Sequence, residues 1–163
     1  MFREMRRKRQ ELSRERAEEI LKGRKLGVLG VNGDGGYPYT VPVNYTYQNG
    51  KIYFHGAKAG HKYDAMLRDD RVSLAVIDRD ETDAERLTTL YTSVIVFGRV
   101  RIIEDEAELI KLGMSFGLQF LNDPEKVESE VKLELPALSM FEITPEHITA
   151  KAAKELIRAE AEK

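Results

Sequence analysis

An alternating segment followed by a tight turn is the feature that most constrains the fold. In residues 39–47 (YTVPVNYTY) the odd positions point one way, and these are Tyr39, Val41, Val43, Tyr45 and Tyr47. Alternation of this kind is typical of a strand with one buried face. Asn49-Gly50 follows, a pair that favours a type I′ turn because both of its residues need positive φ. With residues 51–55 as the return strand, the sequence predicts an antiparallel hairpin.

Pro42 lies in the middle of the first strand of this hairpin and has no N–H to donate. We therefore expect it at a sheet edge, at a bulge or facing a non-protein partner. Thr40 and Asn44 share its face, whereas Val41 and Val43 point towards the presumed core. Two interpretations stay open. Residue 42 either lies under a bound aromatic ring whose polar atoms reach the adjacent N–H groups, or it blocks unwanted pairing at an edge.

Apolar periodicity and helix-capping residues predict the remaining elements. Helices are expected at about 13–22 (capped by Ser13 and closed by Gly23), 61–70, 104–121, 124–135 and 149–161. Further strands are expected at 26–31, 72–77, 91–103 and 137–143, whereas residues 79–90 show no clear pattern. Neighbouring strands with occasional helical insertions favour an antiparallel barrel over a βαβ fold. We predict one mainly β domain over residues 1–163, with the barrel at about 25–144.

Composition and charge exclude several classes of function. The chain has no cysteine, which excludes disulfides, thiolate catalysis and Cys-ligated metals and favours an intracellular protein. No apolar run approaches the roughly 18 residues of a membrane span, and no secretory signal is visible, so a cytoplasmic location is expected. The net charge of −2 argues against a nucleic-acid partner, although residues 1–25 carry ten Lys or Arg against five Glu. Because those charges interleave, this basic segment is interpreted as a solvated helix.

The stretch YFHGAKAGHK, residues 53–62, concentrates two histidines, two glycines and two lysines after a predicted strand. It is not a P-loop, because Gly56 and Gly60 are one residue too close and Tyr63 replaces the magnesium-binding hydroxyl. A Gly-rich loop that runs into a helix is nevertheless an anion site, since backbone N–H groups and the helix dipole both favour negative charge. Lys58, His61 and Lys62 are available for charge-assisted hydrogen bonds to a phosphate. The alternative is a loop with solvated cations.

Metal and hydrolase chemistry find little support in the residue pattern. His55 and His61 are six residues apart, His147 is distant, and no carboxylate or cysteine set accompanies them, so no metal site is predicted. Haem ligation through one histidine stays open. No nucleophile-elbow signature indicates a Ser-His-Asp hydrolase.

Taken together, these motifs resemble the FMN-binding split-barrel family related to pyridoxamine 5′-phosphate oxidase, in particular its nitroimidazole-resistance (Nim) branch. YPYTVPV, YFHGAKAGHK and SVIVFGRV at these spacings carry the resemblance. It covers nearly the whole chain, in the segments 5–11, 26–31, 36–47, 50–67, 91–108 and 147–154. Such proteins usually show glycine where this chain has Ala150. The arginine-and-serine phosphate set of pyridoxamine-phosphate oxidases is not recognisable, which argues against pyridoxamine phosphate as substrate.

The resemblance implies a six-stranded antiparallel split barrel with flanking helices that forms a homodimer and holds FMN between subunits. By position, the phosphate is expected against Gly60, His61 and Lys62. The ribityl side is expected against His55, Gly56 and Ala57. The flavin ring is expected along Val41, Pro42 and Val43, and the strand around Tyr91 and Ser93 is expected to approach from the partner subunit.

The function implied is that of an oxidoreductase that moves electrons between FMN and a small oxidised substrate, for which the branch name suggests a nitroimidazole. The cofactor carries the redox chemistry in such proteins, so no catalytic side chain is predicted. Two alternatives stay open: a non-catalytic flavin-binding or redox-sensing module, and a haem-binding split barrel with His55 or His61 as ligand.

Overall fold

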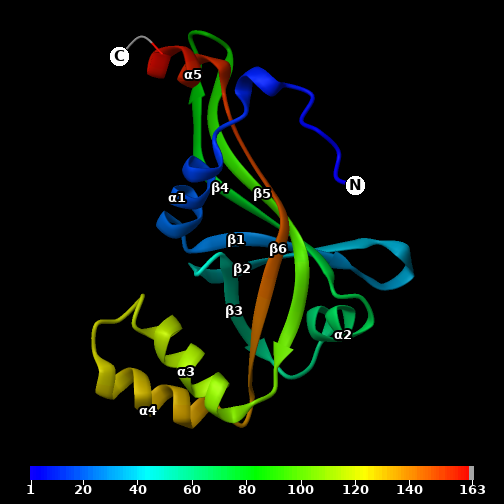
Figure 1. Ribbon diagram of the computed structural model, residues 1–163, viewed down its shortest axis with the longest axis vertical. Helices are drawn as coiled ribbons and strands as arrows, with labels where there is room; N and C mark the ends of the chain where they lie inside the picture. Colours follow the sequence, from blue (N-terminus) through cyan, green and yellow to red (C-terminus); the bar gives the residue numbers. More distant parts are fainter. Residues whose placement is uncertain (162–163) are drawn as a thin grey trace.

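The computed structural model describes residues 1–161, within which six antiparallel strands form a closed barrel in the order β1-β2-β3-β6-β5-β4 (Figure 1). This confirms the predicted mainly β class. The strands are β1 (Leu26–Asn32), β2 (Pro38–Gln48), β3 (Lys51–Ala57), β4 (Arg71–Asp83), β5 (Thr88–Ile103) and β6 (Leu138–Ala152). The helices are α1 (Arg14–Gly23), α2 (His61–Arg68), α3 (Glu106–Gly117), α4 (Pro124–Glu134) and α5 (Lys154–Ala161). The predicted domain limit at residue 163 lies outside the described residues.

The predicted hairpin and the first helix form as their local sequences indicate. Asn49 and Gly50 have φ of 51° and 77° between β2 and β3, which matches the positive φ that this turn requires. The hydroxyl of Ser13 accepts a hydrogen bond from the Arg16 N–H at 3.2 Å, and α1 ends at Gly23. Side-chain capping of this kind satisfies one of the free N–H groups at a helix start.

Although the barrel is closed, part of β2 has a partner strand on one side only, and we call its other side the open side of β2. Strand β2 pairs with β1 over residues 38–44 but with β3 only over residues 45–48. The Tyr45 N–H donates to the Lys25 carbonyl at 2.8 Å, so by alternation the N–H of Val43 and that of Val41 also face β1. The nitrogen of Pro42 faces the open side, which agrees with the edge position, one of the three positions expected for it. The N–H groups that face the open side beside it are therefore those of Thr40 and Asn44.

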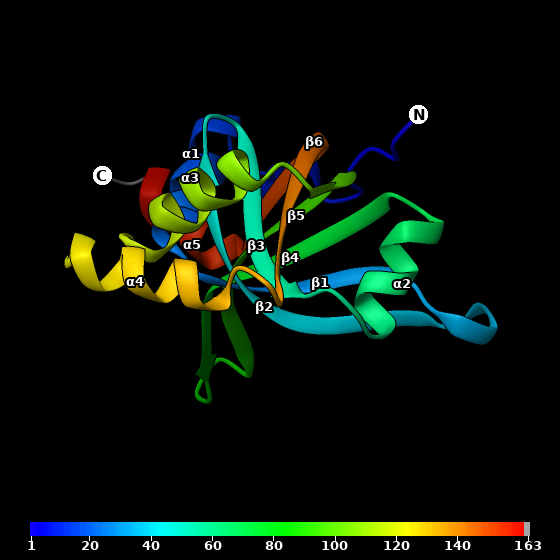
Figure 2. The ribbon, with the colours of Figure 1, turned by 90° about the horizontal axis from the view of Figure 1, so that it is seen from below.

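Two apolar clusters hold the barrel and its helices together. The larger cluster fills the barrel, where Tyr45, Leu74 and Phe141 are completely buried, and α1 covers one end through Ile20 and Leu21. The smaller cluster joins α3 to β3, β5 and β6 and consists of Tyr53, Ile103, Leu109, Phe116 and Met140. In Figure 2, α3 and α4 lie together beside the barrel, on the opposite side from α2.

The C-terminal strand is longer than predicted, and the helix expected at 149–161 begins only at Lys154. Strand β6 continues to Ala152, paired with residues 92–97 of β5, so the barrel does not end near residue 144. Ala and Lys are strong helix formers, but burial of Ala150 and Ala152 against β5 outweighs their propensity. A register shift opposite Gly98 and Pro145 lets the strand continue past the proline.

Other boundaries differ from the predictions for similar reasons. Residues 79–90, which had no predicted structure, extend β4 and β5 into a long hairpin that projects beyond the barrel (Figure 1). Helix α2 ends at Arg68 instead of residue 70, with Ala65 and Met66 buried and Leu67 61% exposed. Helix α3 ends at Gly117 instead of about residue 121. Neighbouring strands and the helix caps decide these ends, and neither is visible in local periodicity.

Replacing Gly98 with alanine is expected to lower the free energy of unfolding by about 1–3 kcal/mol. A Cβ at this position would lie 2.4 Å from the Thr144 carbonyl oxygen, a backbone atom that cannot move without breaking the ladder. Chemical denaturation measures the effect. Gly23→Ala is the control, because a Cβ there meets no atom within 4 Å. Equal stability of the two variants would contradict the close approach of β5 and β6.

Candidate functional site

The segment 53–62 forms the end of β3, an exposed loop and the first turn of α2. Gly60 is the N-cap residue of α2. Its φ of 105° is readily adopted by glycine but rarely by other residues, and no side chain caps the helix. The first intrahelical hydrogen bond runs from the Asp64 N–H to the Gly60 carbonyl at 3.0 Å. The N–H groups of residues 61–63 therefore have no intrahelical acceptor, and they form a ready-made site for an anion.

Lys62 is a half-buried cation next to this turn. Its Nζ lies 5.5 Å from the ring centroid of Phe54 and 5.9 Å from that of Phe141. Desolvation lowers the pKa of Lys62, and no carboxylate pairs with it among the residues that the structure describes. A Cβ on Gly56 would lie 3.0 Å from the ammonium, so glycine leaves the space beside it open. An unpaired, partly desolvated ammonium is stabilised by a bound anion.

His55 lies close to this cation at the end of β3. Its ring meets Phe116 of α3 edge to face, with centroids 5.0 Å apart. Desolvation, and secondarily the charge of Lys62, lowers the pKa of His55. The imidazole is therefore neutral at pH 7, able to donate one hydrogen bond and accept another.

His61 does not join Lys62, although the two residues are adjacent in sequence. Its ring lies 4.1 Å from that of Tyr39, and its Nε2 accepts a hydrogen bond from the Asp34 N–H at 3.3 Å. The side chain thus contacts the turn between β1 and β2. Lys58, also expected near the phosphate, instead extends away and donates to the Leu135 carbonyl at 3.3 Å. Ala57 is exposed at the end of β3, where it pairs with Leu138 of β6.

The residues expected along the flavin ring lie on the part of β2 that lacks a partner on one side. Val43 is buried, Val41 is half-buried against the core and Pro42 is exposed. The expectation that N–H groups next to Pro42 are free holds for Thr40 and Asn44 but not for the valines, since strand alternation turns the valine N–H groups to β1. Contact between this edge and a cofactor stays a prediction.

Tyr91 and Ser93 lie on β5, far from Lys62 within one chain. Tyr91 pairs with Asp80 of β4, and Ser93 pairs with Ile77. Figure 1 shows this part of β5 near α5, whereas α2 lies towards the other end of the long axis. One chain therefore does not bring all the predicted site residues together.

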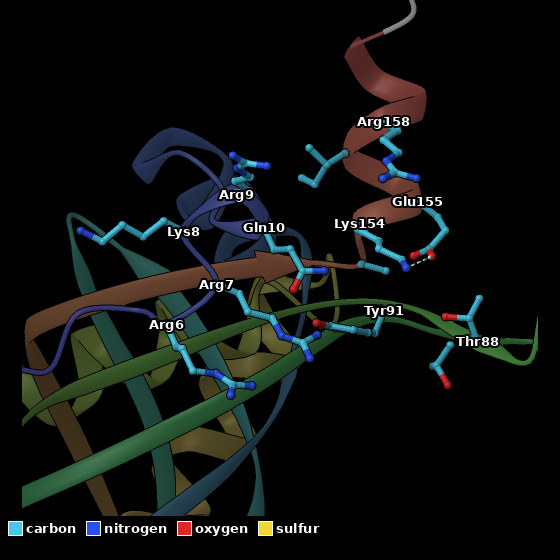
Figure 3. A pocket seen from close by; sticks show the side chains of 13 residues that line it. Arg6, Arg7, Lys8, Arg9, Gln10, Thr88, Tyr91, Lys154, Glu155 and Arg158 are labelled. Atoms are coloured by element: carbon cyan, nitrogen blue, oxygen red, sulfur yellow. Dashed lines mark ion pairs between the residues drawn. The ribbon is translucent and has the colours of Figure 1, made fainter.

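Sequence reasoning missed a pocket of about 970 Å³ between the N-terminal segment, β5 and α5 (Figure 3). Tyr91 is the one predicted site residue in its wall. Basic side chains dominate the wall, and they are Arg6, Arg7, Lys8, Arg9, Lys154 and Arg158. The run RRKR at 6–9 was the available signal, but its interpretation as part of a solvated face did not anticipate α5 beside it.

Among the described residues, no helix is long and apolar enough to cross a membrane.

Comparison with known proteins agrees with the fold. No curated protein matches the chain. A candidate 5-nitroimidazole antibiotic resistance protein from Bacteroides thetaiotaomicron has 19% identity and a TM-score of 0.71, covering 87% of this chain and 86% of that one. A FAD-binding protein from Mesorhizobium loti has 25% identity and a TM-score of 0.61, with coverages of 88% and 97%. A FAD- and haem-binding protein from Mycobacterium smegmatis has 19% identity and a TM-score of 0.72, with coverages of 93% and 80%.

The assignment to a family rests on a match along most of the sequence. The matched region begins at the N-cap of α1 and ends at the last residue of β6, so it takes in the whole barrel. It includes the alternating strand, the glycine loop and Lys62. Since the sequence model described as pyridoxamine 5′-phosphate oxidase matches residues 13–152, the chain belongs to that family.

Proposed function

We propose that this protein is a homodimeric FMN-binding flavoprotein that transfers electrons between the flavin and a small oxidised molecule. The observation that carries the proposal is Lys62, a half-buried ammonium without a carboxylate partner among the described residues, beside the uncapped start of α2. Such an arrangement suits a terminal phosphate. Family membership and the FAD-binding relatives support a flavin as the molecule that carries this phosphate.

In this proposal the residues of the chain bind and orient the cofactor. The N–H groups of residues 61–63 and the Lys62 ammonium hold the phosphate, while neutral His55 and Gly56 flank the ribityl chain. The open side of β2 at residues 41–43 supports the ring, with the N–H groups of Thr40 and Asn44 free to donate. When bound, the flavin supplies the electron-transfer chemistry. His61 contributes its backbone N–H, since its side chain contacts Asp34 and Tyr39.

The choice of FMN over FAD rests on the number of phosphate groups that the cationic site at Lys62 can bind. Lys62 and one helix turn offer a single cationic centre, which fits one terminal phosphate. The nitroimidazole-resistance relative supports a small oxidised substrate of the nitroimidazole kind. Titration of cofactor-free protein with FMN and with FAD tests the choice, and tighter binding of FAD would contradict it.

The colour of the purified protein tests the proposal as a whole. We expect the two absorption bands of an oxidised flavin, which NADH or NADPH then bleaches in anaerobic solution. A flavin that neither nucleotide reduces would favour the alternative of a non-catalytic binding or sensing module. A Soret band without flavin bands would contradict the proposal and favour haem. His55 is then the candidate ligand, because the Nε2 of His61 is already hydrogen-bonded.

FMN is expected to stabilise the homodimer, because Tyr91 and Ser93 reach the proposed cofactor only from a partner subunit. A ligand that binds only the native dimer adds about 2.7 kcal/mol at a hundredfold excess over its Kd. Analytical ultracentrifugation with and without FMN measures the shift in the monomer–dimer equilibrium. A monomer that binds one FMN per chain with undiminished affinity would contradict the intersubunit site.

A further inference from the structure

The turn between β1 and β2, residues 33–37, is attached to α2 at both ends of that helix. At the start of α2, the Nε2 of His61 accepts a hydrogen bond from the Asp34 N–H at 3.3 Å. At its end, Arg68 Nη2 donates to Asp34 Oδ1 at 2.7 Å. In Figure 2, α2 accordingly lies beside β1 and β2. Asp34 is therefore held to α2 through its backbone as well as its carboxylate.

The packing of Gly33 shows that this contact is closely fitted. Its φ of −80° is open to any residue, so the glycine is not needed for the backbone conformation. A Cβ at this position would lie 2.7 Å from the Tyr37 carbonyl oxygen and 3.2 Å from the Nε2 of His61. The turn thus passes the imidazole with no room for a side chain between them.

His61 connects the two parts of the proposed cofactor site. Its backbone N–H belongs to the first turn of α2, where the phosphate is expected. Its ring lies 4.1 Å from that of Tyr39, which is on β2 and packs against the barrel core. Tyr39 directly precedes Thr40, whose N–H faces the open side of β2. A change in the His61 contact would therefore move the ring end of the site relative to the phosphate end.

We propose that His61 is a positioning residue whose neutral imidazole keeps the open side of β2 in place relative to the phosphate-binding turn of α2. An imidazole that accepts a hydrogen bond at Nε2 is neutral and carries its proton on Nδ1. The inference rests on the proposed function for its ligand, because FMN has to reach both parts of the site at once. It requires no contact between the His61 side chain and the cofactor.

Protonation of His61 is expected to change the atoms that hold the turn. A protonated Nε2 donates instead of accepting, so it loses the Asp34 N–H. The Asp34 carboxylate becomes its partner, since Oδ2 already lies 3.6 Å from Nε2. The ionisable groups around His61 are the Asp34 carboxylate in the turn, the Tyr39 phenol on β2, and Lys62, Asp64 and Arg68 on α2. The turn is therefore held differently by the neutral and by the protonated ring.

Nuclear magnetic resonance of the cofactor-free protein tests the contact without any flavin. Between about pH 8 and pH 5.5, where histidines gain a proton, the Asp34 amide signal should shift with the same midpoint as the His61 ring signals. In His61→Gln the shift at that midpoint should be absent, because glutamine does not titrate. An Asp34 signal that does not follow the protonation of His61 would overturn the proposal.

Titration of cofactor-free variants with FMN at about pH 8 tests the positioning role. His61→Leu should weaken FMN binding about two- to fivefold, the lower part of the range for one hydrogen bond, because the Asp34 N–H is exposed. His61→Gln should restore the affinity, since its amide oxygen replaces Nε2 as acceptor. Riboflavin lacks the phosphate and should bind both variants equally. His147→Leu is the control, because His147 lies on β6 against Phe2.

The outcomes separate positioning from a structural role and from failure of the proposed function. Equal losses of FMN affinity in His61→Leu and His61→Gln would overturn the proposal. So would a lower melting temperature in His61→Leu with unchanged FMN affinity, because His61 would then serve stability alone. Protein that binds no FMN but shows the pH-dependent Asp34 signal would contradict the proposed function, while the contact between His61 and the turn would stand.

Discussion

Replacing Lys62 with alanine is expected to weaken FMN binding about 10- to 150-fold, the effect of losing one hydrogen bond to a charged group. The structure gives a specific reason: the ammonium is half-buried over Phe54 and Phe141, where it has no carboxylate partner within the described part of the chain. A phosphate is then its principal counter-charge. Fluorescence titration of cofactor-free protein with FMN measures the change.

Lys58→Ala is the matched control, since it removes an exposed lysine of the same loop whose Nζ contacts the Leu135 carbonyl. Its FMN affinity should match that of the unchanged protein. Lys62→Met adds a second test, because it keeps the apolar stem but removes the charge that burial penalises. We expect this variant to melt at a higher temperature without FMN and to bind FMN weakly. Loss of stability with unchanged FMN affinity would show that Lys62 has a structural role instead.

Glu142→Gln is expected to lower the free energy of unfolding at pH 7 by about 3 kcal/mol. Glu142 is 4% exposed on β6 and is held by its neighbours on both adjoining strands. The Lys51 ammonium lies 2.7 Å from one carboxylate oxygen, and the Tyr53 hydroxyl donates to the other at 3.0 Å. Arg101 donates to both oxygens at 3.1 Å. The glutamine side chain keeps the shape of glutamate but lacks the negative charge to which Lys51, Tyr53 and Arg101 donate.

The same carboxylate predicts how stability depends on pH. Burial alone would raise the pKa of Glu142, but hydrogen bonds from Arg101, Lys51 and Tyr53 outweigh it and lower the pKa to about 2. The folded-state pKa lies below the ordinary value of 4.5, so this contribution is complete above pH 4.5 and is lost as the pH falls towards 2. Denaturation curves in that range should therefore decline less in Glu142→Gln than in the unchanged protein.

Glu128→Gln controls for the general effect of removing a negative charge. Glu128 is exposed on α4 and pairs with Lys132 one turn away. Surface pairs of this kind contribute about 0.3–0.5 kcal/mol, so the variant should be nearly as stable as the unchanged protein. Equal losses in the Glu142 and Glu128 variants would contradict the buried network.

The sequence by itself determined those features that depend on neighbouring residues. The hairpin of β2 and β3 follows from strict alternation and from a pair of residues that tolerate positive φ. The start of α1 follows from the Ser13 cap, and the missing N–H of Pro42 limited that residue to a few positions, of which an edge is one. The uncapped start of α2 after Gly60 follows from the glycine loop. In each case the interactions are local, so a short window of sequence contains all the groups that take part.

Tertiary structure alone decided the features that depend on distant residues. Residues 149–152 form a strand because β5 offers a paired edge, which outweighs the helix propensity of Ala and Lys. His61 turns to Asp34 although its sequence neighbour Lys62 points towards Phe54, because adjacent helical positions face different directions. The pocket between the N-terminal segment and α5 joins Arg7 and Gln10 to Arg158 across nearly the whole chain. Which side chains meet across such separations is set by the packing of the barrel, and no local pattern records it.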